Sequence, residues 1–397
     1  MNIELAISSF GETTPLEETG KAISHDQRIR DLLEGIILAD KLNIDAFAIG
    51  EHHRKDFAVS APEIILAAAA SKTKQIHLSS ATTNLPTINP IRVYEQYATI
   101  DAIAPGRVEI MAGRGSFTEA FDLFGYDLDN YDELFIEKLK MLLKMNKEEI
   151  LDWPKGKFTP RADHKGIYPR TKKPLPISVA TGGSIESTIR TAELGLPIVY
   201  AIIGGDPLHF KPLIKLYRRV AEKVGNDLTK MPIAAHSWGW LDQDKEKAIK
   251  DYFYPTKLLV DQISTERPQW NGMTYEQYLE SVGENGAIFV GDSETVANKI
   301  IKVMEELSLT RFYLHLPIAS MPHEDVMNAI RIYGEEVVPR VKAYFREKDE
   351  KERLRLKWKN NKKLRCNKIS FCWATNGRII IINRNNGRKQ RGYNCRG

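Results

Sequence analysis

Short apolar runs alternate with longer stretches of helical pattern along most of the chain. Several runs are almost continuously apolar, such as 46–50 and 198–203, which is typical of parallel strands buried on both faces. The pattern predicts strands at Glu4–Phe10, Ala46–Glu51, Ile76–Thr83, Val108–Gly115, Pro176–Gly182, Ile198–Gly204, Ile233–Leu241 and Arg311–Leu316.

Helical patterns fill the intervals between these strands. Apolar residues recur at helical spacing, for example at Ile29, Leu32, Leu33 and Ile36. This alternation indicates an α/β fold, a (β/α)8 TIM barrel with insertion loops at its C-terminal mouth. A doubly wound open sheet shows the same alternation and is the competing architecture.

Two segments are expected to be the insertion loops. Residues 152–174 are rich in proline, glycine and lysine, and residues 255–286 contain Trp270, Tyr275 and Tyr278. Loops of this length usually form lids over a functional site or are disordered.

Length and composition exclude several classes of protein. With 397 residues and 42% hydrophobic content, the chain can bury a large core, and three cysteines are too few for a disulfide-rich scaffold. No apolar run approaches the roughly 20 residues of a membrane helix. The first residues lack the basic region and apolar stretch of a secretory signal. We therefore expect a soluble cytoplasmic protein.

The positive net charge is confined to the C-terminal residues. Residues 347–397 hold 16 Lys+Arg and 4 Asp+Glu, which leaves 41 basic and 48 acidic residues for 1–346. Residues 1–346 are predicted to form the barrel domain. Their acidic net charge gives no electrostatic support for nucleic-acid binding. We interpret 347–397 as an aberrant extension, disordered or loosely attached. A basic nucleic-acid arm is the alternative, and zinc is disfavoured because Cys366 and Cys372 lack a second pair.

Barrel active sites lie at the C-terminal ends of the strands, so these positions carry the candidate chemistry. Glu51-His52-His53 follows the second predicted strand. Adjacent side chains on extended chain point to opposite sides, so at most one of the two histidines faces the mouth. Zinc is weakly supported. A lone histidine is more often structural, but the position at a strand end makes one histidine of this pair a candidate site residue.

Two turns after the fourth and fifth predicted strands suit an anion. Arg114 is flanked by glycines, which let the backbone approach an anion while the guanidinium supplies charge. Gly183 and Ser184 open a helix that contains Ser187, and a helix N-terminus is a ready phosphate site. An ordinary helix N-cap is the alternative for the second turn. Because the two strands are neighbours, both turns are expected to hold one phosphate.

Further residues lie along the last two predicted strands. His236 and Trp238 suit a flat heterocycle or an apolar substrate, although tryptophans are more often core residues. His315 alternates with apolar neighbours and is expected to be buried and satisfied. Walker A and Gly-x-Gly-x-x-Gly patterns are absent from the sequence, which argues against a nucleoside-triphosphate or Rossmann site.

Residues 3–345 resemble the bacterial luciferase-like family of flavin-dependent monooxygenases. The resemblance rests on the order and spacing of short motifs. These are Glu51-His52-His53, Leu85-Pro86-Thr87, Pro90-Ile91-Arg92, Gly106-Arg107, Gly113-Arg114-Gly115, Phe124-Gly125, Gly183-Ser184 with Ser187, Gly195-Leu196-Pro197 and Gly291-Asp292-Ser293. The family fold is a (β/α)8 barrel, in agreement with the apolar pattern.

The resemblance implies reduced FMN in the barrel mouth. Arg114 with the backbone of Ser116, and Gly183, Ser184 and Ser187, match the family's two phosphate-binding segments. His52 matches a histidine near the flavin that assists proton movement.

The resemblance also predicts an unusual peptide bond at the end of the third predicted strand, and it shows one difference from the luciferases. Ala81-Thr82 falls where the family often has a non-prolyl cis peptide beneath the flavin ring. Gly113 stands where the luciferases proper have cysteine, so we expect no reactive thiol beside the flavin, and light emission is doubtful.

By the same resemblance, reduced flavin reacts with dioxygen to a 4a-hydroperoxide, and a small organic substrate takes one oxygen atom. A deazaflavin-dependent hydride-transfer oxidoreductase and a non-catalytic flavin-binding protein are the alternatives. We expect a homodimer, and a separate flavin reductase as the source of reduced FMN, without membrane or nucleic-acid partners for residues 1–346. The sequence leaves the substrate open.

Overall fold

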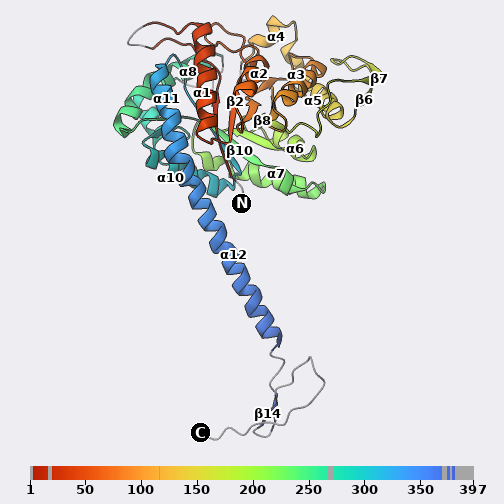
Figure 1. Cartoon of the computed structure of the whole chain (residues 1–397), viewed down its shortest axis with the longest axis vertical. Helices are drawn as coiled ribbons and strands as arrows, with labels where there is room; N and C mark the ends of the chain where they lie inside the picture. The colour runs from red at the N-terminus through yellow and green to blue at the C-terminus, as the bar shows by residue number, and fades with distance from the viewer. Residues whose placement is uncertain are drawn as a thin grey trace. The chain divides into compact units, whose positions relative to one another are not determined.

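The structure, a computed structural model, describes residues 3–16, 20–115, 117–266, 272–368, 373–375 and 378–380. Strands and helices alternate along the chain, and helices surround the strands (Figure 1). None of the helices within these ranges is long and apolar enough to cross a membrane.

Within the described ranges, eight parallel strands close into a barrel. In barrel order they are β1 (Glu4–Ser9), β2 (Ala46–Ile49), β3 (His77–Ser80), β5 (Val108–Gly113), β8 (Ile177–Thr181), β9 (Ile198–Ala201), β10 (Ile233–Leu241) and β12 (Arg311–His315). β12 pairs with β10 on one side and with β1 on the other, so the sheet has no open edge at this point. The predicted barrel is confirmed, and the open sheet is excluded.

The third predicted strand is interrupted. β3 ends at Ser80, and β4 (Thr83–Asn84) pairs with β5 after a cis peptide bond between Ala81 and Thr82. The cis bond expected from the resemblance is therefore confirmed. A short strand that the sequence analysis missed, β11 (Phe289–Gly291), pairs with the end of β10.

Both predicted insertion loops contain regular structure. Most of a two-stranded hairpin, β6 (Ile150–Trp153) and β7 (Ala162–Gly166), lies in 152–174. The loop prediction was wrong for much of 255–286, where α8 (Lys245–Glu266) continues through Pro255 and α9 (Tyr275–Val282) follows. Phe253 of α8 packs against Tyr275 and Tyr278 of α9 at ring distances of 4.8 and 5.2 Å. Trp270 lies outside the described residues.

The other helices connect the strands and cover the barrel. They are α1 (His25–Lys41), α2 (Pro62–Lys72), α3 (Pro90–Ile103), α4 (Glu119–Leu123), α5 (Tyr131–Lys147), α6 (Ile185–Glu193), α7 (Lys211–Lys223), α10 (Ser293–Leu307), α11 (His323–Ile332) and α12 (Val338–Lys368). Single turns of 3-10 helix occur at η1 (Leu128–Asn130), η2 (Pro207–Phe210) and η3 (Leu228–Lys230), and η4 (Tyr333–Val337) is a π-helical turn. Side-chain oxygens of Ser24, Asn89, Ser184 and Asp292 cap the first turns of α1, α3, α6 and α10.

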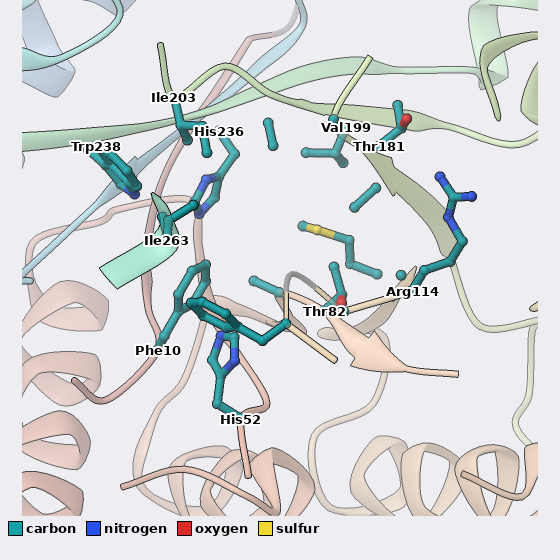
Figure 2. A pocket seen from close by; sticks show the side chains of 18 of the residues that line it. Phe10, His52, Thr82, Arg114, Thr181, Val199, Ile203, His236, Trp238 and Ile263 are labelled. Carbon is teal, nitrogen blue, oxygen red and sulfur yellow. The ribbon is translucent and has the colours of Figure 1, made fainter. Parts of the chain in front are cut away.

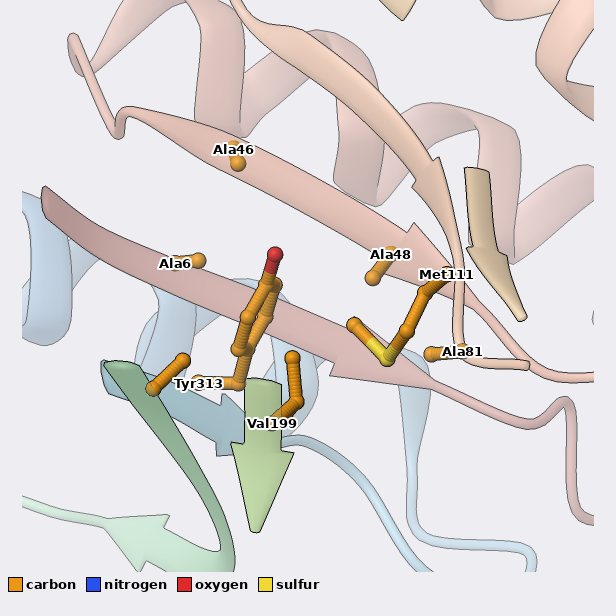
Figure 3. Packing of buried hydrophobic residues seen from close by; sticks show 8 residues of the cluster. Ala6, Ala46, Ala48, Ala81, Met111, Val199 and Tyr313 are labelled. Atoms are coloured by element: carbon orange, nitrogen blue, oxygen red, sulfur yellow. The ribbon is translucent and has the colours of Figure 1, made fainter. Parts of the chain in front are cut away.

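Small side chains inside the barrel make room for a few large ones (Figure 3). The buried cluster consists of Ala6, Ala46, Ala48, Ala81, Met111, Val199, Ala234 and Tyr313. At the N-terminal ends of the strands, Arg311 pairs with Glu4 and Glu109, and its guanidinium donates to the Tyr313 hydroxyl at 2.7 Å. This network fills the N-terminal end of the barrel, so the space for a ligand lies at the other end.

The barrel belongs to a compact unit that ends at Val341, and a second unit begins at Lys342. α12 crosses this boundary and also the predicted boundary at 346. The part of the tail up to Lys368 is therefore helical, where we expected disorder or loose attachment. Within the second unit, β13 (Trp373–Thr375) pairs antiparallel with β14 (Arg378–Ile380). That the tail is an aberrant extension remains a prediction.

Candidate active site

A cavity of about 470 Å³ lies at the C-terminal ends of the barrel strands (Figure 2). Most barrel strands, or the segments directly after them, contribute to its lining. The lining includes Phe10, His52, Phe57, Ala81, Thr82, Arg114, Phe117, Gly182, Ser184, Val199, His236 and Trp238. Both the candidate histidine and the two predicted anion turns therefore reach the same cavity.

His52 follows β2 and is almost completely buried. Its ring lies against Phe57, with 4.2 Å between centroids, and against Phe10 and Phe117. Nδ1 lies 3.8 Å from Oε1 of Glu119, a residue at the start of α4 that the sequence analysis missed. Burial alone would raise the pKa of Glu119, but the neighbouring His52 ring and the backbone N–H of His53, which donates to Oε1, hold that pKa below its ordinary value.

His53 points away from the cavity, as the alternation of an extended chain predicts. Its Nε2 is 3.1 Å from Oε1 of Glu51, and its ring meets that of Phe124 edge to face. The other carboxylate oxygen of Glu51 accepts from the backbone N–H of Asn84 at 2.8 Å. Glu51 and His53 therefore hold the segment after the cis peptide, and of these two adjacent histidines His52 is the one that lines the cavity.

Arg114 follows β5 and lines the cavity on the same side as Thr181 (Figure 2). Its Nη1 binds Oδ1 of Asp132 at 2.5 Å, and its guanidinium lies 4.8 Å from the centre of the Tyr131 ring. The adjacent Gly115 has a φ of +82°, a conformation that favours glycine. The turn thus presents a cation to the cavity, held by a carboxylate.

Gly113 and Thr82 share one space beside the cavity. A Cβ on Gly113 would lie 2.3 Å from Oγ1 of Thr82, so a cysteine side chain has no room there without a shift of Thr82. Ala81 and Thr82 both line the cavity, as expected.

The second turn reaches the cavity through Gly182 and Ser184. The hydroxyl of Ser184 accepts from the backbone N–H of Ser187 at 3.1 Å, so this side chain is the N-cap of α6. Gly183, with a φ of +105°, and the buried Ser187 shape the turn without lining the cavity. Ser116 lies outside the described residues. The roles predicted for all these residues remain predictions.

An arginine that the sequence analysis missed links the two turns. Arg190, on α6, has Nη1 3.8 Å from the Asp132 oxygen that binds Arg114. This Nη1 is buried and has no hydrogen-bond partner. Burial lowers the pKa of Arg190, Asp132 opposes that effect, and Arg114 adds to it. The sequence carried no signal for this role of Arg190, because Asp132 lies far from it in the chain.

His236 and Trp238, on β10, line the opposite part of the cavity (Figure 2). His315, on β12, is completely buried and bound on both ring nitrogens, at 2.7 Å to Glu12 and 3.2 Å to Ser8. The prediction of a buried, satisfied His315 is confirmed.

Comparisons with known proteins show which family the chain is similar to. Residues 5–311 match the family described as luciferase-like monooxygenase. N-acetyl-S-alkylcysteine monooxygenase of Bacillus subtilis is 27% identical over 303 residues, 71% of this chain and 84% of that protein. F420-dependent glucose-6-phosphate dehydrogenase of Amycolatopsis mediterranei is 22% identical and covers 79% of this chain and 95% of its own length.

A solved structure shows the same fold. The oxygenating constituent of 3,6-diketocamphane monooxygenase from Pseudomonas putida, in complex with FMN, superposes with a TM-score of 0.68 at 20% identity. The match covers 85% of this chain and 98% of that one. The family match spans well over half of the chain. The chain therefore belongs to the luciferase-like monooxygenase family.

Proposed function

We propose that the chain is a flavin-dependent monooxygenase that uses reduced FMN and dioxygen to oxygenate a small organic substrate. The observation that carries this proposal is the convergence of the Arg114 turn and the Gly182–Ser184 turn on one cavity at the barrel mouth. The monooxygenases among its relatives, one of them solved with FMN, support the same class of reaction.

The residues of the two turns fit a phosphate. Nη1 of Arg190 is a buried donor without a hydrogen-bond partner in the described residues. A Cβ on Gly182 would enter open space, so the cavity wall is open at Gly182. The first N–H groups of α6 have no acceptor within the helix and lie at its positive end. Arg114, Arg190 and the start of α6 would together hold the FMN phosphate.

The other side of the cavity suits proton movement in a place shielded from water. Bound reduced FMN supplies the electrons that activate dioxygen, one atom of which enters the substrate. His52, with Nδ1 directed to Glu119, would donate or accept a proton at its other ring nitrogen. Phe10, Phe57 and Phe117 surround His52 and exclude water from this part of the site. A homodimer and a separate flavin reductase remain part of the proposal.

The phosphate site is tested by comparing FMN with riboflavin, which has no phosphate. Arg114→Ala should weaken FMN binding by about 1–3 kcal/mol, the range for hydrogen bonds to charged groups, and leave riboflavin binding unchanged. Arg92→Ala is the control, because Arg92 is an exposed arginine of α3 paired only with Glu95 in the described contacts. Equal loss for both flavins in Arg114→Ala, or no loss for either, would contradict the phosphate assignment.

The reaction class is tested with different cofactors. Titration with reduced FMN, oxidised FMN and F420, followed by dioxygen uptake, should show that reduced FMN binds and reacts. Tight F420 binding without dioxygen uptake would indicate the hydride-transfer class, to which the glucose-6-phosphate dehydrogenase relative belongs by its name. Stable FMN binding without turnover on any donor would indicate a flavin-binding protein.

A further inference from the structure

Four buried polar side chains form a continuous line of hydrogen bonds that ends at the cavity. Nε2 of His236 lies 2.7 Å from Oγ of Ser8, and Nδ1 of His315 lies 3.2 Å from the same oxygen. Nε2 of His315 lies 2.7 Å from Oε1 of Glu12. The line therefore runs from β10 through β1 and β12 to the segment after β1, and only His236 lines the cavity.

The line is closed off from solvent. Ser8 and His315 are completely buried, and Glu12 and His236 are 3% and 7% exposed. The Phe10 ring lies parallel to His236 at 5.6 Å and packs on His315 at 4.2 Å. A buried line of this kind has few routes for a proton other than its own members.

Charged and ionisable groups approach the line mainly at its Glu12 end. Arg28 of α1 donates from Nε to the backbone oxygen of Glu12 at 2.9 Å. The negative charge of Asp31, on the same helix, attracts the Arg28 guanidinium. Tyr252 of α8 is close enough to interact electrostatically with Glu12. At the other end, Tyr313 of β12 lies 6.4 Å from His236, ring to ring.

The chemistry of the four groups sets the direction of the bonds. Where Glu12 is a carboxylate it only accepts, so Nε2 of His315 donates to it, and Nδ1 of His315 then serves as the acceptor for the Ser8 hydroxyl. Ser8 has one proton to donate, so its oxygen accepts from Nε2 of His236. Nδ1 of His236 is then the ring nitrogen left for a molecule in the cavity, and Oε2 of Glu12 is buried without a partner.

We propose that Glu12, His315, Ser8 and His236 form a proton relay between the cavity and Glu12, and this inference rests on the oxygenase function proposed above. A proton taken up at Nδ1 of His236 is matched by transfer of the Nε2 proton to Ser8. The Ser8 proton passes to Nδ1 of His315, and the Nε2 proton of His315 passes to Glu12. Both imidazoles exchange tautomers, Ser8 keeps one proton, and only Glu12 changes charge.

The surroundings of His236 favour passage of a proton over its retention. Burial, together with the neighbouring His315, lowers the pKa of His236 to about 3. His236 is therefore neutral near pH 7, and a positive charge does not accumulate on it. The relay thus differs from His52, which lies on the other side of Phe10 and outside the line of bonds.

The relay is tested by rates of oxidation of protein-bound reduced FMN by dioxygen in H2O and D2O. Glu12→Gln keeps an acceptor for His315 but takes up no proton, and Ser8→Ala interrupts the line. Each should slow the reaction by at least about tenfold, with a changed solvent isotope effect. Ser9→Ala is the control, because Ser9 is a buried neighbour on β1 whose hydroxyl accepts only from the backbone N–H of Gly11 in the described contacts.

Wild-type rates and isotope effects in Glu12→Gln, with FMN bound, would overturn the relay even where Ser8→Ala does not fold. A second readout needs no flavin. Histidine 15N spectra of the free protein should show a proton on one and only one of the two nitrogens that face Ser8, Nε2 of His236 and Nδ1 of His315. Protons on both or on neither would break the line and overturn the proposal. Failure of FMN to bind to the wild-type protein would instead count against the proposed function.

Discussion

At the scale of single residues, two of the glycines that line the cavity, Gly113 and Gly182, are required for different reasons. Gly113 faces the side chain of Thr82, and a Cβ would lie 2.3 Å from its hydroxyl oxygen. Gly182 faces open space, and its backbone is outside the left-handed region. Gly113 therefore serves packing, whereas Gly182 leaves room in the cavity wall.

Alanine substitutions separate these two roles. Gly113→Ala should lower the free energy of unfolding by about 1–3 kcal/mol, because Thr82 must move in a packed site. Gly182→Ala should change the free energy of unfolding by less than about 0.5 kcal/mol. It should still weaken FMN binding, because the added methyl group enters the cavity. Denaturant unfolding and FMN titration measure both effects. A stable Gly113→Ala variant, or a Gly182→Ala variant with unchanged affinity, would show that the roles are misassigned.

At the scale of secondary-structure elements, a buried lysine of α10 caps the C-terminal end of α9. Nζ of Lys299 donates to the backbone oxygens of Gly283 and Ile288 at 2.6 and 2.7 Å, and lies near that of Val282. These oxygens belong to or follow the last turn of α9, where helical carbonyls have no partner in the helix.

Replacement of this lysine should destabilise the protein, because carbonyl groups at the end of α9 lose their hydrogen-bond donor. Lys299→Met keeps the apolar stem and removes the donor, so several buried carbonyls lose their partner at a cost of about 2–5 kcal/mol. Lys302→Met is the matched control on the same helix, because Lys302 binds the exposed Glu284 and should contribute less than about 1 kcal/mol. Similar midpoints of thermal unfolding for the two variants would contradict this role of Lys299.

The first turn of α2 gives the protein a dependence of stability on pH. Burial, and then the nearby charge of Glu51, raise the pKa of Glu63 to about 7, and its Oε1 has no hydrogen-bond partner. The unfolded chain loses this proton near its ordinary value of 4.5. Between these values the folded state binds more protons, so the free energy of unfolding falls as the pH rises from about 4.5 to 7.

Glu63→Gln should remove this dependence. The loss of stability in the wild-type protein amounts to up to about 3 kcal/mol by pH 8, and the variant should gain stability relative to wild type over the same range. Unfolding measured at pH 5 and pH 8 gives the comparison, with Glu294→Gln, at an exposed first-turn glutamate of α10, as the control. Parallel pH profiles for wild type and Glu63→Gln would show that Glu63 is ionised in the folded state at both values.

At the scale of the whole molecule, the barrel could be predicted because several of its strands are nearly continuous apolar runs that alternate with helical patterns. β11 was missed because three residues are too short for a period, and α8 because Pro255 reads as a break. The two turns could be predicted from their glycines and their place after neighbouring strands. Arg190 and Glu12 could not, because their meaning depends on partners far away in the sequence, Asp132 and His315.

The charge of the whole molecule separates the barrel from the C-terminal residues. Deletion of 347–397 removes 16 basic and 4 acidic residues and turns a net charge of +5 into −7. The compact unit that holds every cavity residue ends before this deletion. We therefore expect the truncated chain to keep its unfolding midpoint and its FMN affinity, and to lose any salt-dependent binding of nucleic acid, which depends on basic side chains. Thermal unfolding, FMN titration and DNA binding at two salt concentrations, each on the full and the truncated chain, measure the three expectations. Loss of FMN binding on truncation would show that the deleted residues support the barrel. DNA binding that survives truncation would show that the DNA-binding surface lies on the acidic residues 1–346, against the charge distribution.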